Sequence, residues 1–136
     1  MRTGSLWLYA VTIGLCLWAS LARTEVWVVT DQDHSVEGTP DRLIELDAPV
    51  RIEAAFSAGL PTNPENAAAA VRQRMAADKK ALHLRLSRAY QDVIDAWQLG
   101  VDRIPAVVVD QRYVVYGERN LRRALSRIEA YRGQQP

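Results

Sequence analysis

Residues 99–117 have the sequence LGVDRIPAVVVDQRYVVYG, and this stretch decides the fold class. It contains two short runs, 106–110 and 113–116, that are rich in valine and tyrosine, residue types that favour β-strands. Only Gln111 and Arg112 lie between the two runs. Two strands joined by so short a link form an antiparallel hairpin. The sequence therefore predicts a β-hairpin in its C-terminal part.

A long helical segment precedes the hairpin. Residues 65–99 contain no glycine or proline, and apolar residues recur in them at spacings of three, four or seven. Asn63 and Pro64 are typical of the start of a helix, and Gly100 is typical of the position after its last turn. The pattern predicts one long central helix, or two helices that meet near residues 78–80. Its core-facing stripe is expected to consist of Val71, Met75, Leu82, Leu86, Ala89, Val93 and Trp97.

The remaining segments supply two more strands and two shorter helices. Residues 25–30 form a β-branched and aromatic run, and residues 42–46 are a second strand candidate beyond a polar loop. The segment from Asp47, its expected cap, to Gly59 is predicted to be helical, and residues 119–132 are predicted to form the last helix. The order β, β, α, long α, β, β, α predicts an α/β fold with a small mixed sheet.

The composition is that of one globular domain. The chain has 136 residues, of which 49% are hydrophobic and 24% are charged, so it lacks the low hydrophobicity of a disordered protein. Its 17 basic and 16 acidic side chains leave a formal net charge of +1, which gives no footprint for direct nucleic-acid binding. A single cysteine excludes an intrachain disulfide, a Cys-x-x-Cys pair and a cysteine-rich zinc site.

Residues 1–22 have the layout of a secretory signal peptide. Arg2 supplies a positive charge, a mostly apolar run follows at residues 6–18, and Ser20 and Ala22 are the small residues of a cleavage site. The apolar run is short for a helix that spans a bilayer, and an uncleaved anchor is the alternative. Cleavage would remove the cysteine and leave no segment apolar enough to cross a membrane. We therefore expect a periplasmic protein.

The stretch at residues 99–117, with the helix after it, resembles the C-terminal half of thioredoxin-like folds. In those folds a proline, usually in cis, precedes the first strand of the hairpin, and Pro105 matches it. The resemblance implies one thioredoxin-like domain at residues 25–132, followed by a polar tail at 133–136. Where the redox members have Cys-x-x-Cys after the first strand, residues 31–35 are DQDHS. Thiol–disulfide exchange needs a thiolate, so we expect no enzyme activity and no cofactor.

More narrowly, the chain resembles a family of small exported proteins encoded in integrating conjugative elements. The shared segments are VWVVTD at residues 26–31, RLIELD at 42–47, GLP at 59–61, and IPAVVVD and YVVYG in the hairpin. These proteins are similar to exported pilus-assembly components of type IV secretion systems, some of which have thioredoxin-like folds. The resemblance implies a part in conjugative DNA transfer and supplies no catalytic residues.

One candidate site follows the first predicted strand. Asp31, Asp33 and His34 lie together in the sequence, and carboxylates with an imidazole are ligands for divalent cations. The alternative is a turn in which the aspartates accept hydrogen bonds from backbone N–H groups. We favour the capping turn and expect no bound metal.

The other candidate site is a peptide-binding groove around Pro105. Tyr113 and Tyr116 are aromatic anchors that favour interfaces, and Trp27 is a further candidate anchor. Packing in the core or within the hairpin is the alternative for all three aromatic residues. The basic side chains of the last helix are expected to form a solvated face; they are Arg119, Arg122, Arg123, Arg127 and Arg132.

Together these features predict a non-catalytic, exported accessory protein of an integrating conjugative element. It is expected to bind other exported proteins of a conjugative transfer apparatus similar to type IV secretion. One alternative is a periplasmic chaperone or degenerate isomerase that binds peptides without thiol exchange. The other is a metal-dependent enzyme that uses the Asp31, Asp33 and His34 loop.

Overall fold

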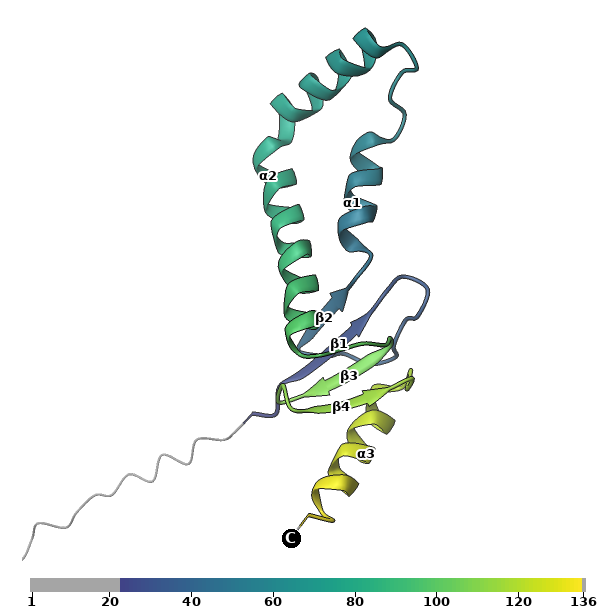
Figure 1. Ribbon diagram of the computed structural model, residues 1–136, viewed down its shortest axis with the longest axis vertical. Coiled ribbons are helices and arrows are strands. Elements are labelled where there is room, and N and C mark those ends of the chain that lie inside the picture. Colours follow the sequence, from purple (N-terminus) through teal and green to yellow (C-terminus); the bar gives the residue numbers. More distant parts are fainter. Residues whose placement is uncertain (1–22, 136) are drawn as a thin grey trace, which may run out of the picture.

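The computed structural model describes residues 23–135 (Figure 1). The predicted signal peptide at residues 1–22 and Pro136 lie outside the described residues. The predicted order of elements is confirmed, and the helix and strand bounds are β1 (Val26–Thr30), β2 (Arg42–Glu45), α1 (Ala48–Ser57), α2 (Pro64–Gln98), β3 (Ala106–Val109), β4 (Tyr113–Tyr116) and α3 (Leu121–Arg132).

The four strands form one mixed sheet in the order β2-β1-β3-β4. β1 runs parallel to β2 and antiparallel to β3, and β3 pairs antiparallel with β4. The small mixed sheet, the C-terminal hairpin and the long helix that the sequence predicts are therefore all present. The peptide bond between Ile104 and Pro105, at the entry to β3, is cis.

The hairpin turn lies one residue earlier than the sequence predicts. Asp110 and Gln111 both have φ of 52°, and the Arg112 N–H donates to the Val109 carbonyl over 3.1 Å. Asp110 is therefore a turn residue and not the last residue of the strand. Its carboxylate accepts from the Glu25 N–H at 3.0 Å and from Arg132 at 2.6 Å. Asp110 therefore connects the turn to the start of β1 and to the end of α3.

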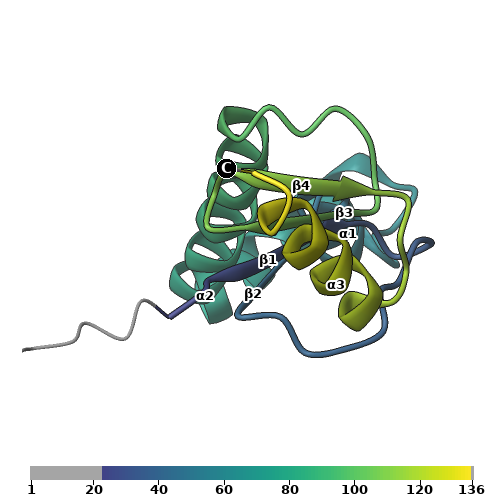
Figure 2. The same ribbon diagram turned by 90° about the horizontal axis from the view of Figure 1, so that it is seen from below.

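Apolar side chains from both faces of the sheet are buried. On one face, Val28 and Val107 pack with residues of α3, namely Leu121, Ala124 and Ile128. On the other face, Val29 and Val108 pack with Ile44 of β2 and with Ala96 near the end of α2. The domain therefore has three layers, with α3 and the end of α2 on opposite sides of the sheet (Figure 2). Each fully buried valine contributes roughly 1.5–3 kcal/mol.

Beyond the sheet, α1 and the first half of α2 extend as a helical arm (Figure 1). The side chain of Asn63 caps α2 by accepting from two backbone N–H groups, as the sequence predicts. Asp78 has non-helical backbone angles, so two helical segments meet within the predicted range 78–80. The prediction that Asp47 caps α1 is wrong, because its carboxylate makes no capping bond and instead pairs with Arg51 at 2.9 Å.

The prediction that Trp97 belongs to the core is also wrong. Its neighbour Ala96 is buried against the sheet, whereas 81% of the surface of Trp97 is exposed. Successive residues of a helix differ in direction by about 100°. Once Ala96 faces the sheet, Trp97 is therefore directed away from it.

Arg42 joins the sheet to α2. Its guanidinium donates to Asp92 and, at 2.6 Å, to Asp95, and it lies 4.4 Å from the centre of the Trp27 ring. Gln91 donates to Asp95 as well, and these hydrogen bonds, first that of Gln91 and then that of Arg42, hold the pKa of Asp95 below its ordinary value. One side chain of β2 thus fixes the position of α2 over the sheet.

We expect Arg42→Met to lower the free energy of unfolding by about 1–3 kcal/mol, because charge-assisted hydrogen bonds are lost and Asp92 and Asp95 are left facing each other. Urea unfolding at neutral pH measures the change. Arg72→Met is the matched control, since Arg72 is exposed on α2 and forms no ion pair among the described residues. Equal stability of the two variants would contradict the role of Arg42.

Candidate functional site

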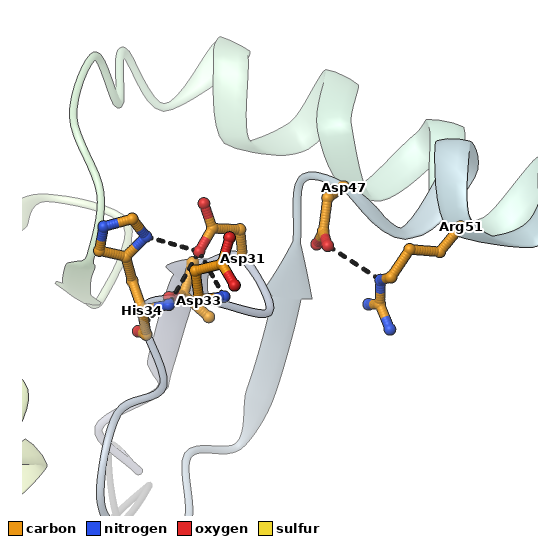
Figure 3. A network of polar contacts seen from close by, with 6 residues as sticks. Asp31, Asp33, His34, Asp47 and Arg51 are labelled. Carbon is orange, nitrogen blue, oxygen red and sulfur yellow. Dashed lines mark hydrogen bonds and ion pairs between the residues drawn. The ribbon is translucent and has the colours of Figure 1, made fainter.

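The loop after β1 contains Asp31, Asp33 and His34, which the sequence analysis singled out as a candidate site. It contains no helix, and its polar groups bind one another (Figure 3). One carboxylate oxygen of Asp31 accepts from the backbone N–H groups of Asp33 at 3.0 Å and His34 at 2.9 Å. The same oxygen lies 2.6 Å from Nδ1 of His34. Because an ionised carboxylate only accepts, Nδ1 carries the proton in this contact.

These hydrogen bonds determine the chemistry of the loop. The side-chain contact with His34 is the main reason that the pKa of Asp31 lies below its ordinary value. Thr30, at the end of β1, donates its hydroxyl to the His34 carbonyl at 2.5 Å. The loop is therefore a capping turn whose acidic group is already occupied by protein donors.

The same loop lacks a constellation for metal binding. Among residues 23–135, no group of three or more histidine, cysteine, aspartate or glutamate side chains is placed to hold a metal ion. Asp33 contributes only its backbone N–H to the network around Asp31. The hydrogen bonds that Asp31 accepts from the Asp33 and His34 N–H groups are those of the capping turn that the sequence analysis favoured.

The rest of the loop is attached to the start of α3. The Glu37 N–H donates to the Arg119 carbonyl at 2.7 Å, and the Leu121 N–H donates to the Glu37 carbonyl at 2.9 Å. Gly38 follows with φ of 123°, and a Cβ atom there would lie 2.7 Å from Cβ of Leu121. Only glycine fits this close approach. Gly38 thus allows the loop to lie directly against the start of α3.

The predicted groove residues are not all brought together. Pro105 is buried, and its carbonyl accepts from the Gly117 N–H at 2.8 Å, which places it beside Tyr116. Tyr116 packs on the sheet face that α2 covers, whereas Tyr113 packs on the face that α3 covers. Trp27 is buried in the core. A single groove therefore does not contain the predicted anchors, because residues three apart on a strand lie on opposite faces.

The model of one protein family, described as "Protein of unknown function (DUF1525)", matches residues 23–134. The chain belongs to this family. The match covers nearly all of the described residues, so the whole domain is the family's conserved unit. No curated protein and no solved structure matches the chain. The resemblances to thioredoxin-like folds and to proteins of conjugative elements stay predictions for this DUF1525 domain.

Sequence reasoning missed an exposed apolar surface on α2. Tyr90, Ile94 and Trp97 are 49%, 44% and 81% exposed, and we call these three residues the Trp97 surface. Their spacing of four and three residues places them on one side of the helix. Tyr90 is held in place by a 2.7 Å hydrogen bond from its hydroxyl to Glu53 of α1. The spacing was visible in the sequence, but Trp97 also fits the neighbouring stripe that was expected in the core.

The helices of the domain were also compared with the requirements for a membrane span. In the part of the chain that the structure describes, no helix combines the length and the apolar character that crossing a bilayer requires. The helix α2, on which the Trp97 surface lies, carries many charged side chains as well as this apolar patch.

We expect Asp31→Asn to lower the free energy of unfolding at pH 7. A carboxylate whose pKa is depressed by folding stabilises the protein above its unfolded pKa and loses this effect as pH falls through its folded pKa. The difference from the original protein should therefore shrink as pH falls below about 4, the ordinary pKa of an aspartate. Urea unfolding across this range measures it. Asp33→Asn is the control, and the same pH dependence in both variants would contradict the assignment to Asp31.

Proposed function

We propose that the chain is a non-catalytic, exported binding protein of an integrating conjugative element, located in the periplasm. In this role it binds other exported proteins of the conjugative transfer apparatus. The resemblance of its strand, loop and hairpin segments to such proteins supports a part in conjugative transfer. The layout of residues 1–22 supports export.

The Trp97 surface is the observation that carries a binding role. A tryptophan is a large apolar side chain, and leaving most of it in water forgoes roughly 2 kcal/mol or more of burial free energy. Tryptophan and tyrosine are enriched among the residues that dominate protein–protein affinity. Here Trp97 lies beside Ile94 on a helix whose position Arg42 fixes, so the surface needs little ordering when a partner binds.

The polar groups of the domain support binding rather than catalysis. Residues 23–136 contain no cysteine, so thiol exchange has no nucleophile. In the loop after β1, the Asp31 carboxylate accepts from the backbone N–H groups of Asp33 and His34 and binds the His34 ring. These contacts hold the turn in place and engage Nδ1 of His34 with the Asp31 carboxylate.

The proposal predicts direct contacts between the Trp97 surface and other exported proteins of the same element. A photo-crosslinking residue in place of Trp97, in cells that carry the whole element, should attach to such proteins, and mass spectrometry identifies them. The same residue in place of Arg72 is the matched control, since Arg72 is exposed on the distant half of α2. Crosslinks at position 97 should exceed those at position 72.

A second variant separates binding from folding. Trp97→Ala should leave the free energy of unfolding within about 0.5 kcal/mol of its original value, because the side chain is exposed. It should nevertheless reduce the recovery of the partners identified by crosslinking. Undiminished recovery, or crosslinks only to unfolded proteins unrelated to the transfer apparatus, would contradict the proposal.

A further inference from the structure

The strand β4 is an open edge of the sheet. It is the last strand in the order β2-β1-β3-β4, and its sequence YVVY contains no charged residue or proline to protect it. The Gly117 N–H bonds to the Pro105 carbonyl, so the bonded residues of the strand are Tyr113 and Val115. The backbone N–H and C=O groups of Val114 and Tyr116 consequently point away from the sheet.

A groove runs beside this edge. It has a volume of about 480 Å³ and is lined only by residues of β4, of α3 and of the segments that flank them. Tyr113 and Tyr131 form one wall, with ring centres 6.3 Å apart, and Val115 and Ile128 contribute to the apolar lining. Because no residue of β3 lines it, the groove lies on the outer side of β4. A strand added there would direct every second side chain into it.

The surroundings of the groove carry positive charge. Arg112 and Arg127 line it. Within residues 23–135, Arg112 has no carboxylate at ion-pair distance, and Arg127 is 64% exposed although it approaches Glu118 at 3.5 Å. Arg132 at the end of α3 lies 4.4 Å from the centre of the Tyr113 ring, although it also pairs with Asp110 at 2.6 Å. The edge therefore favours a partner with negative charge.

We propose that β4 binds an extended, acidic segment of a partner protein as an additional strand of the sheet. The backbone of the segment would pair with the outward groups of Val114 and Tyr116. Every second side chain would carry a carboxylate into the groove toward Arg112 and Arg127, and the intervening apolar side chains would lie beside Val114 and Tyr116 on the opposite face of the sheet. A nucleic acid matches the charge but offers no repeating N–H and C=O groups to a strand edge. The inference does not depend on the Trp97 surface or on conjugative transfer.

A synthetic peptide of alternating glutamate and valine, labelled with fluorescein, tests the proposal on the purified full chain. Fluorescence anisotropy should show saturable binding of this peptide. A peptide of alternating lysine and valine should not bind, because its charge has the wrong sign. The glutamate peptide with methylated backbone nitrogens at alternate positions should lose binding, since it keeps its charge but cannot pair with a strand edge.

Two variants assign the site. Arg112→Glu should weaken binding of the glutamate peptide roughly tenfold or more, through loss of one attractive charge and gain of a repulsive one. Arg72→Glu is the matched charge control and should leave binding unchanged. Val114→Pro removes an outward N–H that the sheet does not use, so it should abolish binding while circular dichroism and urea unfolding stay close to those of the original protein.

Three results would overturn the proposal. The first is equal binding of the methylated and unmethylated peptides, which would leave only charge attraction. The second is tighter binding of single-stranded DNA at the same site, shown by competition and by sensitivity to Arg112→Glu. The third is a dimer of the chain that Val114→Pro dissociates, which would make a second copy the occupant of the edge. Loss of the crosslinks at Trp97, in contrast, would leave peptide binding unaffected.

Discussion

The fold depends on the pairing of two strands, β1 and β3, that are buried on both faces. Every residue of β3 and nearly every residue of β1 is apolar, and their side chains alternate between the two faces of the sheet. Both faces therefore require a cover, which α3 supplies on one side and the end of α2 on the other. Because the side chains of β1 and β3 are apolar and buried, these strands lie at the centre of the sheet, and β2 and β4 are its edge strands.

Local signals made much of this fold predictable. The hairpin, the caps and proline positions of α2 and the apolar periodicity act within a few residues, so the sequence alone indicated them. The parallel pairing of β1 with β2 joins strands on either side of a long polar loop, and Glu37 of that loop bonds to the start of α3, which is remote in sequence. The turn at Asp110 and Gln111 lacks the glycine that usually marks positive φ. Its stabilising partner, Arg132, lies on another element.

The candidate sites were harder to predict, because a small change of direction moves a side chain to another surface. On α2, one residue separates buried Ala96 from exposed Trp97. On β4, Tyr113 and Tyr116 lie on opposite faces of the sheet. The two tyrosines that were predicted to line one groove therefore pack against two different apolar clusters. Composition identified the right residue types in both cases. Packing against α3 and α2 decides which of these residues remains available to a partner.

The two edges of the sheet differ in a way that bears on function. At the β2 edge, Arg42 and Glu45 form ion pairs with α2 and α1, so charged side chains of the strand hold helices beside it. At the β4 edge, the charged residues flank the strand instead, and its own side chains pack inward. The Trp97 surface belongs to the helix that Arg42 attaches to β2, whereas the open edge is β4, which lies three strand spacings, or about 14 Å, from β2. The helix surface and the strand edge present different features, a patch of apolar side chains and an extended backbone. The two proposed sites would allow one small domain to hold two partners at once, as an assembly factor does.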